Sequence, residues 1–442
     1  MLKIQCKENN KFQRAKDFHK IKYYKKIKDK LNSKRSILLS GGKYTSEISF
    51  IDKIICELSN ILIGDDIEIK RIISKIHKDY INIENNKTNI MDNKGNQVVM
   101  KDLIMRIFDY ENFSEAKLYN ESINIISSWK REIKNKKRKG FYKGTLNIIE
   151  LRKSIINSIN NMNKIYIGTK FEITSITNQW KNKILTFTIP NTRIILDEDL
   201  KIFDSMKLDL IHMRNEFWGN YNQLKYTMRA DEVKLFWGGY NFIKEIGVMT
   251  CPYCNRIYTN LIIGQSKSYK PALDHFYPKT NYPYLALSLF NLIPSCNICN
   301  SSFKSDTILN IHNLYNTGFE NDYIFKFKVI DDTKPITNKN IKIKIEPKTG
   351  ICMETQHSIN LFELESSYNT HKDIVVNMYK QRKKYSNTEI RRLIKLGCYT
   401  SIPNFVEQVV LNGPIDKSKF SEVPLAKFKR DIAYQVGFLN KL

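Results

Sequence analysis

Two Cys-x-x-Cys pairs, Cys251/Cys254 and Cys296/Cys299, are the residues of this chain whose type and spacing most clearly indicate chemistry. Zinc prefers four thiolate or imidazole ligands in a tetrahedron, and one Cys-x-x-Cys turn supplies two of them. All four ligands come from protein, so the predicted zinc site is closed and structural and does not itself activate water. Packing or redox cysteines are the alternative, but a redox role for one pair leaves the other unexplained.

The segment between the pairs carries polar residues suited to hydrolysis. Asp274 and His275 end a predicted strand, and an apolar segment, residues 284–290, leads to Asn291. Residues 301–309 are predicted to begin a short helix after the second cysteine pair. The expected order of elements is therefore strand, loop, strand and helix.

This stretch resembles the HNH (ββα-metal) endonucleases that carry a four-cysteine zinc knuckle. Their core runs Cys-x-x-Cys, Asp-His-x-x-Pro, Asn-Leu-x-x-x-Cys-x-x-Cys-Asn and Lys. The strings HFYPK and NLIPSC are most similar to the HNH nucleases of Septu-type anti-phage systems. The resemblance covers residues 251–304 of the 442. The matching residues are Cys251, Cys254, Asp274, His275, Pro278, Asn291, Leu292, Cys296, Cys299, Asn300 and Lys304.

The resemblance implies a role for each polar residue. His275 would be the general base that takes a proton from water, a task that suits the ordinary imidazole pKa of about 6.5. Asp274 and Asn300 would hold one catalytic divalent ion, Mg²⁺ or Mn²⁺, because both offer oxygen ligands. Asn291 would brace the loop that orients the histidine. Lysines near the site are the predicted nucleic-acid contacts, Lys279 and Lys304.

Position 300 departs from the strict HNH pattern, because it holds asparagine where the pattern has histidine. A neutral amide oxygen is a weaker metal ligand than a carboxylate and differs from an imidazole, so the preferred metal stays open. The alternative to catalysis is that Asp274 and His275 form a surface turn. The chain would then be a non-catalytic zinc-containing module for nucleic-acid binding or assembly.

The charge balance favours a nucleic-acid partner. The chain has 72 Lys and Arg against 45 Asp and Glu, a formal net charge of +27. An AT-rich genome would raise the number of lysines, but it would not by itself explain why acidic residues are so much fewer. Positive charge of this size fits a phosphate backbone, since each neutralised phosphate releases counterions. DNA is favoured over RNA by the family resemblance, which also implies defence against phage as a role and a partner ATPase subunit.

Composition and hydropathy place the chain among soluble globular proteins, with 42% hydrophobic and 26% charged residues. There is no run of 18 apolar residues and no apolar signal core at the start, so we expect a cytoplasmic protein without membrane contact. No P-loop is present, so control by ATP would need a separate subunit. Cysteines outside the two pairs are scattered and predicted to be reduced, namely Cys6, Cys56, Cys352 and Cys398.

The predicted fold class is α+β, in three parts. Residues 1–247 are predicted to be mostly helical, with a small β insertion near residues 164–190 where β-branched and aromatic residues alternate. Residues 248–310 form the predicted HNH module. Residues 311–442 are predicted to hold a β-hairpin followed by helices.

Several basic segments have two interpretations each. A dense lysine run covers residues 15–31, and it could lie along DNA or be a solvated helix face. Strands predicted at residues 323–330 and 341–345 place lysines on the wet face of their hairpin, with the same two interpretations. A single long basic helix is predicted over residues 371–396.

Overall fold

The structure is a computed structural model in which helices combine with small two-stranded antiparallel sheets. A mixed helix-and-strand fold is therefore confirmed at that coarse level. The residues that it describes are 2–4, 10–86, 90–91, 97–115, 123, 125–131, 133–134, 153–157, 159–160, 174–187, 197–221, 233, 237–263, 268–308, 310–319, 322–348 and 350–440.

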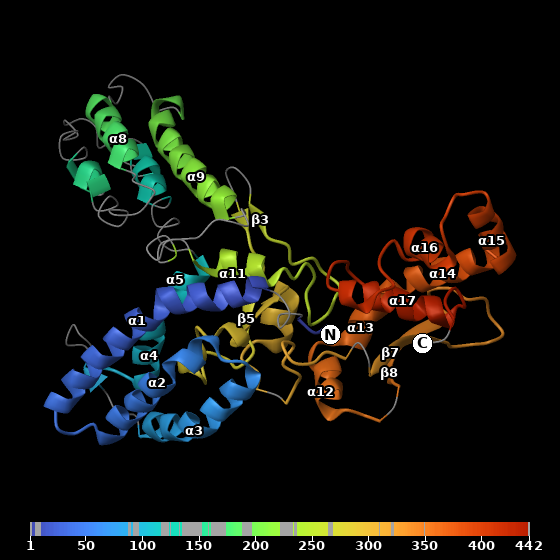
Figure 1. Ribbon diagram of the computed structural model, residues 1–442, viewed down its shortest axis with the longest axis horizontal. Coiled ribbons are helices and arrows are strands. Elements are labelled where there is room, and N and C mark those ends of the chain that lie inside the picture. Colours follow the sequence, from blue (N-terminus) through green and yellow to red (C-terminus); the bar gives the residue numbers. More distant parts are fainter. Residues whose placement is uncertain are drawn as a thin grey trace.

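In the described residues up to 115, the N-terminal part consists of five helices and one small hairpin (Figure 1). Isoleucine and leucine recur at helical spacing along the second and third helices and form their buried faces. Asp65 starts the third helix with a capping box, in which its side chain and that of Glu68 satisfy each other's backbone N–H groups. The elements are α1 (Asn10–Ser40), α2 (Thr45–Ile63), α3 (Asp66–Asn85), β1 (Ile90–Met91), β2 (Gln97–Val98), α4 (Met100–Phe108) and α5 (Tyr110–Glu115).

A second, smaller helical bundle stands apart from α1–α4 in Figure 1 and has its own hydrophobic core. Its helices include α8 (Thr174–Thr186) and α9 (Lys201–Tyr221), which follows the short turn η2 (Glu198–Leu200). The core residues are Ile126, Trp129, Ile133, Ile155, Ile159, Trp180, Ile184, Leu200, Phe203, Met206 and Leu210.

The β insertion predicted near residues 164–190 is wrong where the structure describes it, because residues 174–186 are helix α8. Thr177, Trp180 and Ile184 are buried, and their spacing of three and four residues is that of one helix face. The alternation that suggested a strand begins only at Leu185, in the last turn of the helix. Residues 164–173 and 188–190 lie outside the described part of the chain.

The central segment joins the N-terminal helices to the C-terminal lobe. It begins with α11 (Gly239–Ile246), which packs against α1. Two short antiparallel hairpins follow, and the second carries Asp274 and His275 at the end of its first strand. The elements are β3 (Ile262–Ile263), β4 (Ser268–Tyr269), β5 (Ala272–His275), η3 (Pro283–Leu285), η4 (Leu289–Asn291), β6 (Leu292–Ser295) and η5 (Ile298–Lys304).

The C-terminal lobe contains the predicted hairpin, β7 paired with β8 from Tyr323↔Pro347 to Val329↔Ile341. The prediction of a single helix over residues 371–396 is wrong, although the segment is helical. The segment forms two helices, because Ser386 and Glu389 form a capping box at which the second helix begins. The elements are β7 (Tyr323–Val329), β8 (Ile341–Pro347), α12 (Met353–Leu361), α13 (Leu364–Tyr368), η6 (Asn369–His371), α14 (Lys372–Lys384), α15 (Asn387–Lys395), α16 (Ile402–Phe405), η7 (Val406–Leu411), η8 (Lys417–Lys419) and α17 (Ala426–Gln435).

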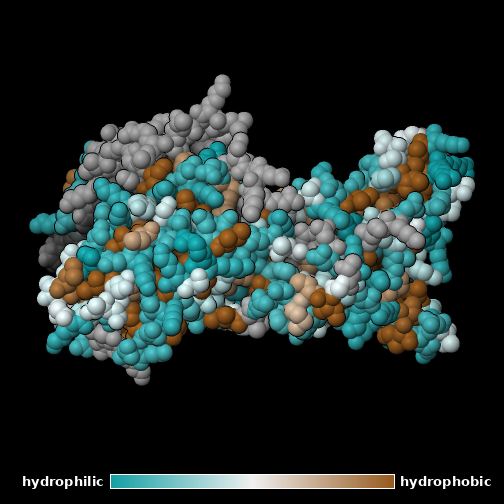
Figure 2. Space-filling model, turned by 60° about the horizontal axis from the view of Figure 1, so that its bottom comes forward, coloured by the Kyte–Doolittle hydropathy of each residue, from teal (hydrophilic) through white to brown (hydrophobic). Residues whose placement is uncertain are grey.

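One hydrophobic core runs through the N-terminal helices, the central segment and the C-terminal lobe, from Ile4 to Phe438. Outside this core, hydrophobic residues appear in small groups on a largely hydrophilic face (Figure 2). Among the described helices, none combines the length and apolar character that a membrane crossing requires. The three predicted parts are thus joined by continuous packing.

Helix α1 holds the central segment through a buried histidine. His19 Nε2 lies 2.7 Å from the backbone carbonyl of Leu287, so this nitrogen carries the proton and donates it. The other ring nitrogen, Nδ1, accepts from the indole Nε1 of Trp237 at 3.2 Å. Burial lowers the pKa of His19 to about 3, so the ring is neutral near pH 7.

His19 should make the fold acid-sensitive. Between pH 6.5 and about 3 only the unfolded chain binds the proton, so the unfolding free energy falls as the pH drops below 6.5. His19→Gln keeps a donor and an acceptor but cannot be protonated. When the pH is lowered from about 7 to about 5, the unfolding free energy of the variant, measured in urea, should fall by about 2 kcal/mol less than that of the wild type. An equal loss in both proteins would contradict this role.

Candidate functional site

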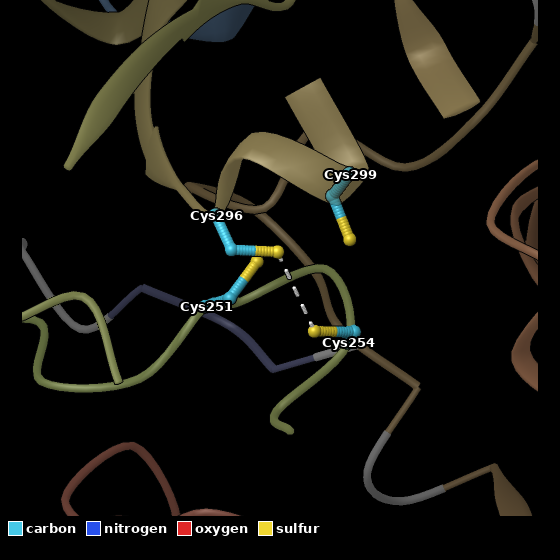
Figure 3. Close-up of side chains that lie close together, drawn as sticks. All are labelled: Cys251, Cys254, Cys296 and Cys299. Carbon is cyan, nitrogen blue, oxygen red and sulfur yellow. Dashed lines mark hydrogen bonds between the residues drawn. The ribbon is translucent and has the colours of Figure 1, made fainter. Parts of the chain in front are cut away.

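The four cysteines of the two pairs meet in one buried cluster (Figure 3). Their sulfur atoms all lie within 4.8 Å of one another, and Cys254 Sγ is 4.0 Å from Cys296 Sγ. A tetrahedral zinc ion with Zn–S bonds of about 2.3 Å requires sulfur–sulfur distances of about 3.8 Å. Four buried thiols at nearly this spacing therefore fit a structural zinc site, as the sequence predicts.

Local backbone geometry brings the first cysteine pair into the cluster. The N–H of Cys251 donates to the carbonyl of Ile257, and the N–H of Asn255 donates back to Cys251 O at 2.6 Å. Asn255 adopts a left-handed conformation with φ of 50°, which asparagine tolerates better than most residues. The backbone N–H of Arg256 then points at Cys254 Sγ at 3.4 Å, a contact that favours a thiolate.

The pKa values of the four thiols do not shift in one direction: burial raises the pKa of Cys251 and hydrogen bonding with Cys251 raises that of Cys299, whereas the pKa values of the other two cysteines are lowered. Hydrogen bonding from Cys251 is the main reason that the pKa of Cys254 is lowered. The pKa of Cys296 is well below its ordinary value because Cys251, Cys254 and Cys299 all hydrogen-bond to it. Burying thiolate charge without a partner is costly, so a cation at the centre would stabilise the cluster.

The candidate catalytic residues lie on the β5–β6 hairpin next to this cluster. Asp274 pairs with Ile293 and His275 with Leu292 in antiparallel register. The second strand begins after Asn291, whereas the apolar segment before it forms the 3-10 turns η3 and η4. The helix expected after the second cysteine pair is η5, a π-helix that begins earlier, at Ile298. The predicted order of strand, loop, strand and helix is otherwise seen.

One ring nitrogen of His275 is engaged in a hydrogen bond to the backbone. Its Nε2 lies 3.0 Å from the carbonyl oxygen of Ala286, which can only accept, so Nε2 carries the proton. In the neutral imidazole the lone pair that can take a proton is therefore on Nδ1. Burial lowers the pKa of His275 to about 3, below the ordinary value on which the sequence argument relied.

Helix α5 covers His275. The ring of Tyr110 meets the imidazole edge-on at 4.4 Å between centroids, and its hydroxyl donates to Leu273 O at 3.3 Å. Lys279 lies over the same tyrosine ring and pairs with Glu111 at 2.7 Å. Lys279, predicted to contact nucleic acid, is thus engaged within the protein by α5.

Asp274 is buried and accepts a hydrogen bond at each of its two carboxylate oxygens. Tyr253 Oη donates to Oδ2 at 2.5 Å, and Lys304 Nζ donates to Oδ1 at 3.2 Å. Lys304 also donates to the backbone carbonyl of His275 at 2.7 Å and is only 1% exposed. Burial raises the pKa of Asp274, although Lys304 and Tyr253 oppose this shift. The ammonium group of Lys304, predicted to contact phosphate, instead takes the cation position beside this carboxylate.

The two asparagines differ in how firmly they are held. Asn291 accepts from the N–H of Tyr277 at 2.6 Å and donates to the carbonyls of Tyr277 and Leu285 at 3.0 Å. These bonds brace the loop after His275, as expected for an orienting residue. Asn300 is half-buried on η5, and its amide donates weakly to Ser301 at 3.5 Å. Because the buried ammonium group of Lys304 occupies the cation position at Asp274, this arrangement does not present an open divalent-ion site.

Sequence reasoning missed Tyr253 and Tyr110. Tyr253 lies between the cysteines of the first pair, is fully buried, and stacks on Phe362 at 4.4 Å. It links the cysteine cluster directly to Asp274. Its position inside the Cys-Pro-Tyr-Cys turn was a signal, but a tyrosine there has no ligand chemistry of its own. Tyr110 lies 165 positions from His275 in the chain, and no spacing rule connects them.

Comparisons with known proteins add no further constraint. No protein-family model matches this chain, no curated protein is significantly similar to it, and no solved structure is significantly similar to its fold.

Proposed function

We propose that this chain is a metal-dependent endonuclease of the HNH type that hydrolyses phosphodiester bonds, with DNA as the favoured substrate. The observation that supports it most is the state of His275. Its Nε2–H bond to Ala286 O leaves Nδ1 as the basic nitrogen, on a hairpin whose turn is braced by Asn291. With its pKa lowered to about 3 by burial this nitrogen is a weak base, so the proposal requires that substrate binding expose the imidazole before it takes a proton from an attacking water.

The proposal includes a catalytic Mg²⁺ or Mn²⁺ held by Asp274 and Asn300. When bound, such an ion would neutralise charge on the phosphate. Since Lys304 now occupies the cation position at Asp274, metal binding would require its ammonium group to move away. The proposal extends to a role in defence against phage with a partner ATPase, which the motif resemblance supports.

A second candidate function is a zinc-containing assembly or nucleic-acid-binding module without turnover. The burial of the candidate catalytic residues favours this second function, because the side chain of His275 is only 8% exposed and is covered by the ring of Tyr110. Incubation of supercoiled plasmid with the purified chain and Mg²⁺ or Mn²⁺ separates the two. Metal-dependent appearance of nicked or linear DNA supports the nuclease. Intact plasmid with either metal, also after addition of the products of neighbouring genes, supports the module.

Tyr253 should position the carboxylate of Asp274, the proposed ligand of the catalytic ion. Tyr253→Phe keeps the ring stack on Phe362 but removes the donor to Asp274. A hydrogen bond to a charged group contributes about 1.5–3 kcal/mol, so we expect nicking to slow by about tenfold or more. The Mn²⁺ concentration for half-maximal nicking should rise, while zinc content stays unchanged.

Tyr315→Phe is the matched control for this variant. The hydroxyl of Tyr315 is also buried and also donates at 2.5 Å, but to the backbone carbonyl of Leu292. We expect its nicking and Mn²⁺ dependence to stay close to those of the wild type. Equal effects of the two substitutions would mean that Tyr253 acts only through packing.

A further inference from the structure

The C-terminal lobe carries a group of exposed cations on two successive helices, which we call the α14–α15 surface. The 16 residues 380–395 contain seven Lys or Arg and a single acidic residue, Glu389, which is used in the cap of α15. Figure 1 shows α14 and α15 toward the end of this lobe, away from β5. The exposed cations are Lys380, Lys383, Lys384, Arg391, Arg392 and Lys395.

These cations share two helix faces. On α14 they are spaced three and four residues apart in the last two turns, after the buried Val375, Val376 and Met378. On α15 the spacing is the same, opposite the buried Ile390. Within the described part of the chain, none of the six forms an ion pair with an acidic side chain. Their charge is therefore available to a partner.

In the part of the chain that the structure describes, some other lysines are paired with acidic side chains or buried. On the hairpin, Lys326 and Lys328 both pair with Glu346, and Lys344 pairs with Glu365. In the lysine run of α1, Lys22 is buried and donates to a backbone carbonyl, whereas Lys20 and Lys25 are exposed. The α14–α15 surface gathers six exposed cations on two successive helices, and none of them pairs with an acidic side chain among the described residues.

The chemistry of the surface indicates which partner it fits. Lysine is depleted in protein–protein interfaces but is a common phosphate contact. Tyr379 and Tyr385 are half-buried beneath Lys383 and Lys384, so no aromatic ring is exposed here for bases to stack on. Stacking platforms are typical of single-strand binding, and their lack favours a duplex. Helix α14, with 13 residues, is about 20 Å long and spans about six base pairs.

We propose that the α14–α15 surface docks the phosphate backbone of duplex DNA, apart from the β5–β6 segment that would cut it. The choice of DNA rests on the proposed nuclease function. Docking by backbone charge would hold the substrate without reading its sequence, because phosphate contacts carry no base information. It would make duplex affinity strongly dependent on salt.

The test compares two fourfold variants of the full chain, each built on His275→Ala so that the probe stays intact. The surface variant is Lys383→Gln, Lys384→Gln, Arg391→Gln and Arg392→Gln. The control variant removes the same charge from the hairpin through Lys326→Gln, Lys328→Gln, Lys342→Gln and Lys344→Gln. Binding of a labelled linear duplex is measured over a range of salt concentrations. Circular dichroism and thermal unfolding verify that both variants are folded.

For the surface variant, the slope of log affinity against log salt should fall by about 3 to 4, because each lost phosphate contact removes about 0.9. For the control variant, the same slope should fall by less than about one. Equal losses in both variants would mean that only net charge matters and would overturn the proposal. Unchanged duplex binding by the surface variant would also overturn it and would favour an acidic protein partner. If the wild type does not nick plasmid but the slope changes as expected, the docking surface stands and the nuclease proposal fails.

Discussion

His275→Ala is expected to slow plasmid nicking by at least about 100-fold, because a general base contributes about 10²- to 10⁴-fold to such a reaction. The substitution removes Nδ1, the ring nitrogen that the bond from Nε2 to Ala286 O leaves free to take a proton. Rates are measured from the conversion of supercoiled to nicked plasmid with Mn²⁺ and with Mg²⁺. Zinc content should stay near that of the wild type, and the variant should unfold cooperatively at a lower temperature, because it loses the bond to Ala286 O and the packing against Tyr110.

His357→Ala is the matched control for this experiment. His357 also makes a ring-nitrogen contact of 3.0 Å to a backbone carbonyl, that of Asn310, but it lies outside the β5–β6 segment. Its loss should leave nicking within about twofold of the wild type, as expected for a residue without a part in the reaction. If the His275→Ala variant cuts as fast as the wild type, the assignment of His275 as the general base is wrong, while the proposal that the chain is a nuclease is not contradicted.

Replacing any one cysteine of the cluster with serine should unfold the central segment or release the metal. Structural zinc contributes about 10–16 kcal/mol of apparent binding free energy in small zinc domains, as much as the whole stability of a typical protein. Cys251→Ser or Cys296→Ser should therefore lower the melting temperature or abolish cooperative unfolding. Differential scanning calorimetry and zinc release to a colorimetric chelator measure the two effects.

Cys398→Ser is the control, because Cys398 is exposed and lies far along the chain from the cluster. It should melt like the wild type and keep its metal. A Cys251→Ser protein that keeps both its metal and its melting temperature would contradict a four-thiolate site. Because Tyr253 joins this turn to Asp274, the cluster variants should also lose nicking even where the chain stays soluble.

The cysteine cluster, the β5 strand and the C-terminal hairpin could be predicted because each depends on local patterns. Cys-x-x-Cys spacing restricts ligand geometry, and alternating side chains define strands such as Tyr323–Val329. The bracing role of Asn291 followed from the motif resemblance, and its three hydrogen bonds are compatible with it.

What could not be predicted depends on tertiary packing. Lys304 was expected to face a phosphate, but the π-helix turns its side chain inward to Asp274. The cover that Tyr110 forms over His275 comes from a helix far away in the sequence, and burial by such a helix determines the pKa of the imidazole. Residues 174–186 form a helix because Trp180 and Ile184 are buried in a neighbouring core, which overrides β-type residues at its end.

The most direct test of the account is the metal content of the wild-type chain purified without added metal. Elemental analysis should find one zinc ion per chain, and X-ray absorption at the zinc edge should show four sulfur ligands at about 2.3 Å. A chain that is folded and free of zinc, or zinc bound by nitrogen and oxygen instead of sulfur, would contradict the structural centre on which the arrangement of Asp274 and His275 depends.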